Sequence, residues 1–250
     1  MSLYFEHTIR LTGMDSDGKG ICKASALLNH LQIAATLAAE DGGFGRELLM
    51  ERYGAFWMLA RSWYRLERPL RWEDEITIRT WHRGDKAAMM YRDYDILVDG
   101  VPVGESVSGW VLANVETRKL MRLSAITELA GTGGGDLCKQ RTLSKLRRPE
   151  RLCPVERRLM RYSDTDINGH VNNTRYADFA CDAVDMDRME ENYYLSQLQI
   201  GYLAECRPGD TITIERGEWG APENGVYLCG VDEEKKVRFE AALHFEQVVP

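Results

Sequence analysis

The chain has 250 residues, of which 44% are apolar and 28% are charged, a composition typical of a globular protein with a substantial core. A net charge of −7 disfavours a general nucleic-acid binder, and the absence of 18 consecutive apolar residues excludes a membrane-spanning helix. No secretory signal is evident at the N-terminus, and the six cysteines show neither CxxC pairs nor zinc-site spacing, so we expect a cytoplasmic protein with reduced thiols.

The two halves of the chain predict the same elements in the same order. In the first half we expect a strand at 5–12, a helix at 23–40 and strands at 56–67, 76–81, 89–98 and 103–115. In the second half we expect a strand at 155–162, a helix at 173–185 and strands at 193–205, 211–218, 226–231 and 237–248. The first helix is apolar on most of its surface, so other elements must surround it. The pattern predicts an α+β fold in which an antiparallel sheet curls around one central helix in each half.

An internal repeat relates these halves. Asp15, Asp17 and Gly20 match Asp164, Asp166 and Gly169 at a constant offset of 149 residues. Further on, Asp74–Ile78 resembles Asp210–Ile214 at an offset of 136, as a longer helix-to-strand connection in the first half would produce. We therefore expect an N-terminal module at 1–130, a linker at 131–154 and a C-terminal module at 155–250.

The linker region is rich in glycine and then strongly basic. After the glycines of 131–135, residues 139–161 contain nine Lys or Arg and two Glu, a local charge of +7. The run is either a solvated linker or a docking surface for an acidic macromolecule, and salt dependence would separate the two. The residues predicted to bind such a partner are Lys139, Arg141, Lys145, Arg147, Arg148 and Arg151.

The most informative segment is Asp164–Tyr176, which reads DTDINGHVNNTRY. Its start resembles a calcium-binding EF-hand loop, but that loop needs a glutamate at its twelfth position, where this chain has Arg175. Asn172 and Asn173 are good N-cap residues, so we expect the second-half helix to begin there. The segment is therefore a polar turn placed before a helix.

Such a turn can support acyl-group hydrolysis. The backbone N–H groups of Val171, Asn172 and Asn173 would lie at the positive end of the helix and could stabilise an oxyanion. His170 and Asp166 could transfer a proton or orient a water molecule. The alternative is that these polar residues only close a tight turn.

The motif G-H-V-N-N-x-x-Y after D-x-N resembles the active-site segment of the acyl-acyl carrier protein (acyl-ACP) thioesterases, which contain two hotdog modules in tandem. The resemblance covers nearly the whole chain, although H-V-N-N alone occurs across hotdog thioesterases. Gly169 stands where plant relatives usually carry a polar residue. The resemblance implies catalytic roles for Asp166, Asn168, His170 and Glu205. Cys206 corresponds to a cysteine once favoured there as a nucleophile, so it is the alternative nucleophile.

The repeat predicts that only one copy is active. The counterparts of Asn168, His170 and Glu205 in the first half are Lys19, Ile21 and Pro69. Each replacement removes the polar group that the second half would use. We expect the first module to line the tunnel that holds the acyl chain of the substrate.

Three functions remain open at this point. The first is hydrolysis of fatty acyl-ACP without a metal or cofactor, by a water molecule that His170 and Glu205 deprotonate. The second is hydrolysis of acyl-coenzyme A at the same site. The third is a hotdog hydratase or acyl-binding module. The sequence leaves open whether the chain is a monomer or a homodimer.

Overall fold

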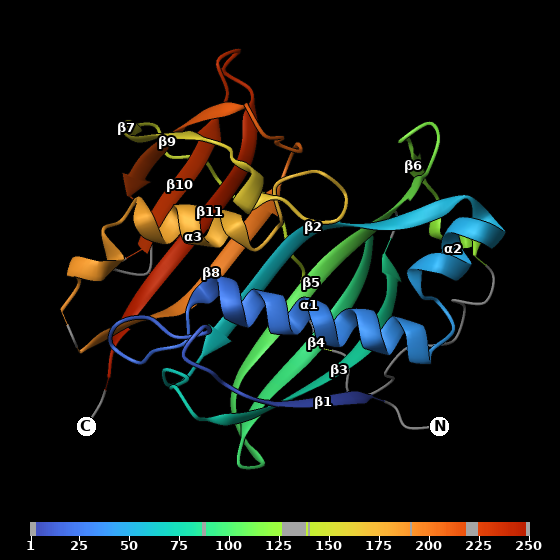
Figure 1. The fold of residues 1–250 in the computed structure, drawn as a ribbon, viewed down its shortest axis with the longest axis horizontal. Helices are drawn as coiled ribbons and strands as arrows, with labels where there is room; N and C mark the ends of the chain where they lie inside the picture. The colour runs from blue at the N-terminus through green and yellow to red at the C-terminus, as the bar shows by residue number, and fades with distance from the viewer. Residues whose placement is uncertain are drawn as a thin grey trace. The chain divides into compact units, whose positions relative to one another are not determined.

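The computed structural model describes residues 4–86, 89–126, 139, 141–190, 192–218 and 225–248 (Figure 1). The chain divides into two compact units, which we consider separately. The N-terminal unit comprises Met1–Leu11, Asn29–Tyr64 and Glu73–Leu143. The C-terminal unit comprises Thr12–Leu28, Arg65–Trp72 and Ser144–Pro250. Residues 131–138 and 140 of the predicted linker lie outside the described residues.

The N-terminal unit contains an antiparallel sheet with a helix across one face. Its strands run in the order β1 (Phe5–Arg10), β3 (Glu75–Lys86), β4 (Met89–Val98), β5 (Val101–Asn114) and β2 (Ala55–Leu66), and the short β6 (Leu120–Met121) pairs with β5. Helix α1 (Ala24–Asp41) lies across β3, β4 and β5 and buries Leu31, Ala34 and Ala35 (Figure 1). Helix α2 (Arg46–Tyr53) follows it and packs Leu49 into the core.

The C-terminal unit repeats this plan. Its strands run in the order β8 (Tyr193–Tyr202), β11 (Val237–Gln247), β10 (Gly225–Val231), β9 (Thr211–Glu218) and β7 (Cys153–Leu159), and neighbouring strands pair antiparallel. Helix α3 (Arg175–Asp182) lies against the sheet and buries Tyr176 and Phe179 (Figure 1). The ring of Tyr176 lies 5.0 Å from that of Phe239 on β11.

These observations confirm the predicted α+β class, with an antiparallel sheet and one central helix in each half. Two elements, α2 and β6, were not predicted. The strand predicted at 193–205 ends at Tyr202, which leaves Glu205 in the following loop. In the described ranges, no helix combines the length and apolar character that a membrane crossing requires.

The two polar turns have matching hydrogen bonds. A carboxylate oxygen of Asp15 accepts the N–H of Thr12, and one of Asp164 accepts the N–H of Arg161, each at 2.8 Å. Asp17 accepts the N–H of Lys19 at 2.9 Å, as Asp166 accepts that of Asn168 at 2.8 Å. Gly20 and Gly169 have φ angles of 72° and 73°. The repeat in the sequence therefore corresponds to a duplicated turn.

The shared glycine should be needed for its backbone conformation alone. A Cβ at Gly169 would meet no atom within 4 Å, so Gly169→Ala adds backbone strain without a clash. We expect it to lower the free energy of unfolding by about 1 kcal/mol, measured by urea denaturation. Gly13→Ala is the control, because Gly13 also has open space and lacks a left-handed φ. Equal stability of the two variants would contradict this explanation.

Candidate active site

His170 and Glu205 face each other from two loops of the C-terminal unit. The backbone N–H of Val171 donates to the carbonyl of Cys206 at 2.8 Å and joins the polar turn to the loop after β8. Nε2 of His170 lies 3.1 Å from a carboxylate oxygen of Glu205. His170 is 8% exposed, whereas the Glu205 side chain is 44% exposed. The pair therefore combines a buried imidazole with a carboxylate that solvent can reach.

An arginine on β11 holds the backbone of Glu205. Nη1 of Arg238 donates to the carbonyl oxygen of Glu205 at 3.0 Å, and the same guanidinium forms an ion pair with Asp232 at 2.8 Å. The sequence analysis missed Arg238, since no local spacing marks a contact between a strand side chain and a distant loop carbonyl.

Asp166 and Asn168 lie in the same turn but do not join the pair. The carboxylate of Asp166 accepts the N–H of Asn168, which is the role that Asp17 has in the other turn. The side chain of Asn168 is exposed and makes no hydrogen bond to His170 or Glu205 in the described structure. Of the four predicted catalytic residues, the structure brings two into contact, and Asp166 shapes the turn.

The helix begins later than predicted, which changes the amides available for catalysis. Helix α3 starts at Arg175, and Oδ1 of Asn172 accepts the N–H and the hydroxyl of Thr174, a hydrogen bond typical of an N-cap residue. The N–H groups of Val171 and Asn172 donate to the carbonyls of Cys206 and Asp164, so neither can stabilise an oxyanion. Within the described ranges, the N–H of Asn173 has no acceptor.

Cys206 is completely buried, and burial raises the pKa of its thiol above the ordinary value. Only the thiolate is a strong nucleophile, and a raised pKa makes it scarcer. The backbone carbonyl of Cys206 accepts the N–H of Val171, as that of Leu70 accepts the N–H of Cys22 in the duplicated turn, and Leu70 is equally buried. Cys206 thus occupies the place of a packed leucine, which argues against the alternative nucleophile.

Cys206→Ala should therefore retain most of the wild-type kcat. The loss of a buried sulfur should lower the free energy of unfolding by about 1 kcal/mol. Thioester turnover and urea denaturation of the same preparation would measure both effects. A loss of kcat as complete as that of a His170 variant would restore the cysteine nucleophile.

Arg238→Ala should lower kcat by about tenfold, because small displacements of a catalytic group are costly. KM should change little, and Arg238→Lys should recover part of kcat, since a lysine can also donate to the carbonyl of Glu205. Arg157→Ala is the control, because Arg157 forms an exposed ion pair with Glu233 outside the site. Equal kcat for Arg238→Ala and Arg157→Ala would contradict the positioning role.

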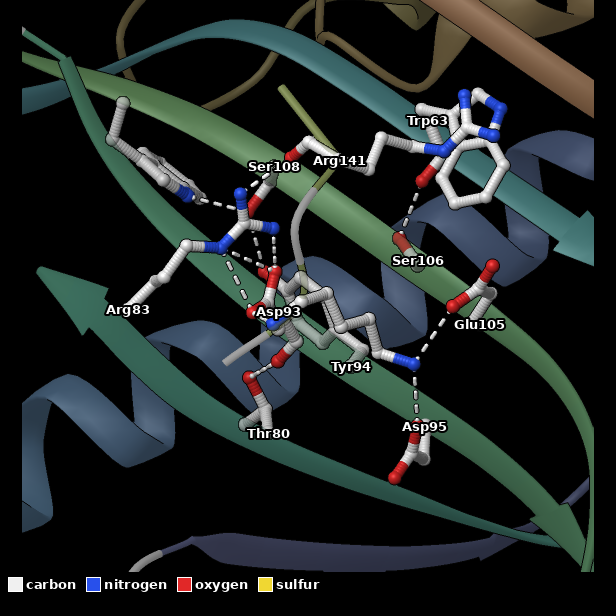
Figure 2. A network of polar contacts seen from close by, with 12 residues as sticks. Trp63, Thr80, Arg83, Asp93, Tyr94, Asp95, Glu105, Ser106, Ser108 and Arg141 are labelled. Carbon is white, nitrogen blue, oxygen red and sulfur yellow. Dashed lines mark hydrogen bonds and ion pairs between the residues drawn. The ribbon is translucent and has the colours of Figure 1, made fainter. Parts of the chain in front are cut away.

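The start of the basic run is fastened to the N-terminal sheet. Asp95 on β4 and Glu105 on β5 are cross-strand neighbours, and Nζ of Lys139 lies 2.7 Å and 2.8 Å from their carboxylates (Figure 2). The guanidinium of Arg141 lies 3.8 Å from the centre of the Trp63 ring. Lys139 thereby compensates two like charges that would otherwise repel each other.

The other basic residues of the run differ in whether they pair with a carboxylate of this chain. Arg148 forms an ion pair with Glu215 at 2.8 Å. Of the six residues predicted to bind an acidic partner, Lys139 and Arg148 already pair with carboxylates of this chain, and binding at the others stays a prediction. Lys145, Arg147 and Arg151 are exposed and have no acidic partner among the residues the structure describes.

His170 and Glu205 are two possible metal ligands, and the described residues contain no group of three or more His, Cys, Asp or Glu suited to a metal ion.

Comparison with known proteins identifies the family. The family model for the acyl-ACP thioesterase N-terminal domain matches residues 2–128, and that for the C-terminal domain matches residues 155–243. A dodecanoyl-ACP hydrolase of Cinnamomum camphora is 26% identical over 223 residues, which cover 82% of this chain and 56% of the relative. An oleoyl-ACP thioesterase of Arabidopsis thaliana is 24% identical over 74% of this chain and 52% of the relative. The chain thus spans about half the length of these relatives.

Solved structures show the same fold. The acyl-ACP thioesterase of Bacteroides thetaiotaomicron superposes with a TM-score of 0.79 at 23% identity, over 98% of this chain and all of that one. The 12:0-ACP thioesterase of Umbellularia californica gives a TM-score of 0.79 at 22% identity, over 99% and 98% of the two chains. These likenesses confirm the predicted tandem hotdog fold. Because the two family models together cover most of the sequence, the chain belongs to the acyl-ACP thioesterase family.

Proposed function

We propose that the chain hydrolyses the thioester of fatty acyl-ACP and releases a free fatty acid. The observation that carries this proposal is the 3.1 Å contact of Glu205 with His170, which belongs to the motif that resembles the family's active site. The first half supports it, because it has Ile21 and Pro69 at the corresponding positions and still forms the matching turn and its contact with the neighbouring loop. The names of the plant relatives point to the same substrate.

The proposed reaction uses water and the residues of the C-terminal unit. His170 and Glu205 together accept a proton from a water molecule, which attacks the thioester carbonyl. The N–H of Asn173 stabilises the oxyanion. The C–S bond then breaks, and the same pair returns the proton to the departing thiolate. Asp166 holds the turn, and Arg238 holds the backbone of Glu205.

One substrate panel tests this function. The purified chain would be offered acyl-ACP and acyl-coenzyme A of graded chain length, with free fatty acid and free thiol as readouts. We expect equal amounts of both products from acyl-ACP, and release about a thousandfold slower with His170→Ala. Faster cleavage of acyl-coenzyme A would favour the second substrate. An altered acyl chain without free thiol would indicate a hydratase.

We also propose a cytoplasmic setting. The described cysteines, which are Cys22, Cys153, Cys181, Cys206 and Cys229, are free thiols, as expected in a reducing compartment, and Cys138 lies outside the described residues. A homodimer stays a prediction that light scattering of the purified chain would test.

A further inference from the structure

Two large apolar side chains beside the candidate site are almost fully exposed. Tyr162 is 89% exposed and Ile167 is 86% exposed, and both belong to the turn that ends at His170. Among the described residues only Met14, at 85%, is comparable. Exposed apolar surface is unfavourable in water, and where it gathers it marks a binding surface.

The duplicated turn shows that neither side chain is needed for folding. At the offset of 149, the counterparts of Tyr162 and Ile167 are Gly13 and Gly18. The hydrogen bonds of the two turns match, so the backbone is built equally well without these side chains. The copy that carries His170 therefore has two exposed large apolar side chains at positions where the first copy has glycine, whereas the first copy exposes Met14, whose counterpart is Ser163.

Two exposed arginines belong to this turn and to the loop hydrogen-bonded to the chain just before it. Arg161 precedes Tyr162, and Arg207 follows Cys206 in the neighbouring loop. The loops are joined at Met160, whose N–H donates to the carbonyl of Asp210 at 2.8 Å and whose carbonyl accepts the N–H of Gly209 at 3.1 Å. Both arginines are exposed, and neither guanidinium has an acidic partner within the described ranges.

Three carboxylates lie within three residues of these arginines, and each contacts another group; that of Glu205 lies 3.1 Å from Nε2 of His170. Asp164 is buried, accepts the backbone N–H of Arg161 and lies 3.3 Å from the guanidinium of Arg175. Asp210 accepts the backbone N–H of Arg207. The two guanidinium groups therefore stay available to an external partner.

We propose that Arg161, Tyr162, Ile167 and Arg207, here called the rim, form the docking surface for the acyl carrier protein. The inference rests on the proposed function, because a carrier whose thioester reaches His170 must cover the residues around that site. The two arginines would pair with carboxylates of an acidic carrier, and the two apolar side chains would contact its apolar residues. The rim thus replaces the linker cations as the main carrier contact.

Paired substrates separate docking from chemistry. We would measure kcat/KM for one acyl group on the carrier protein and on N-acetylcysteamine, a small thiol whose acyl thioester lacks the carrier. For Arg161→Glu/Arg207→Glu we expect the ratio of the two values to fall about tenfold, mainly through KM on the carrier. The activity on acyl-ACP should also become less sensitive to salt. Tyr162→Gly/Ile167→Gly, which introduces the first-half residues, should lower the ratio severalfold.

Two further variants carry the same change in charge. Arg216→Glu/Lys235→Glu alters exposed cations elsewhere in the C-terminal unit and should keep the wild-type ratio. Lys145→Glu/Arg147→Glu alters the exposed linker cations. An unchanged ratio in the rim variants, or a larger loss in the linker variant, would overturn the proposal. Failure of the wild-type chain to cleave acyl-ACP would instead overturn the proposed function, before any variant is compared.

Discussion

His170→Ala is expected to lower kcat on acyl-ACP by a factor of about 10³, the usual contribution of a general base or acid. The imidazole is buried and lies 3.1 Å from Glu205, so its removal leaves that carboxylate without a partner for proton transfer. KM should change little, because the exposed surface beside the site is unaltered. Steady-state release of fatty acid across substrate concentrations would separate kcat from KM.

The duplicated turn supplies a matched control for this substitution. Ile21 occupies the position of His170 in the first half, and both residues are 8% exposed. His170→Ile should therefore preserve the turn and the melting temperature while it removes the chemistry. A variant that melts like the wild-type chain and keeps more than a tenth of its kcat would show that His170 is not required.

The turn was predictable because its causes are local. Aspartates that accept N–H groups two or three residues away and a glycine with a left-handed φ leave the same sequence pattern wherever the turn occurs. Both copies carry this pattern, which is why an offset of 149 residues identified it. The resemblance to the family motif implied the roles of His170 and Glu205, and the first half has Ile21 and Pro69 at their positions, as expected if only one copy is active.

The wrong predictions concern groups whose partners are distant in the sequence. The N–H of Val171 was expected to be free, but the carbonyl of Cys206, 35 residues away, accepts it. The ion pairs of Lys139 with Asp95 and Glu105 were not predicted, because these carboxylates lie on strands far earlier in the chain. Arg238 left no signal for the same reason. Hydrophobic periodicity predicts which face of an element is buried, but it does not predict such individual polar contacts.

Glu205→Gln is expected to lower kcat by a factor of about 10² to 10³, because the amide cannot accept the proton that the carboxylate shares with His170. Glutamine keeps the length of the side chain, and the contact of Arg238 with the backbone carbonyl does not depend on the side chain. A loss of kcat in this variant therefore reports the charge of the carboxylate. Glu205→Asp keeps the charge but moves it one methylene away from His170. The kcat of this variant should therefore fall between the kcat of Glu205→Gln and that of the wild-type chain.

The control for this charge effect is Glu233→Gln, because Glu233 forms an exposed ion pair with Arg157 away from the site. It removes the same charge and should keep the wild-type kcat. If Glu205→Gln matches this control while His170→Ala is inactive, His170 alone deprotonates the water and Glu205 does not take part. If Glu205→Asp is no better than Glu205→Gln, the 3.1 Å contact with Nε2 matters as much as the charge, because aspartate restores only the charge.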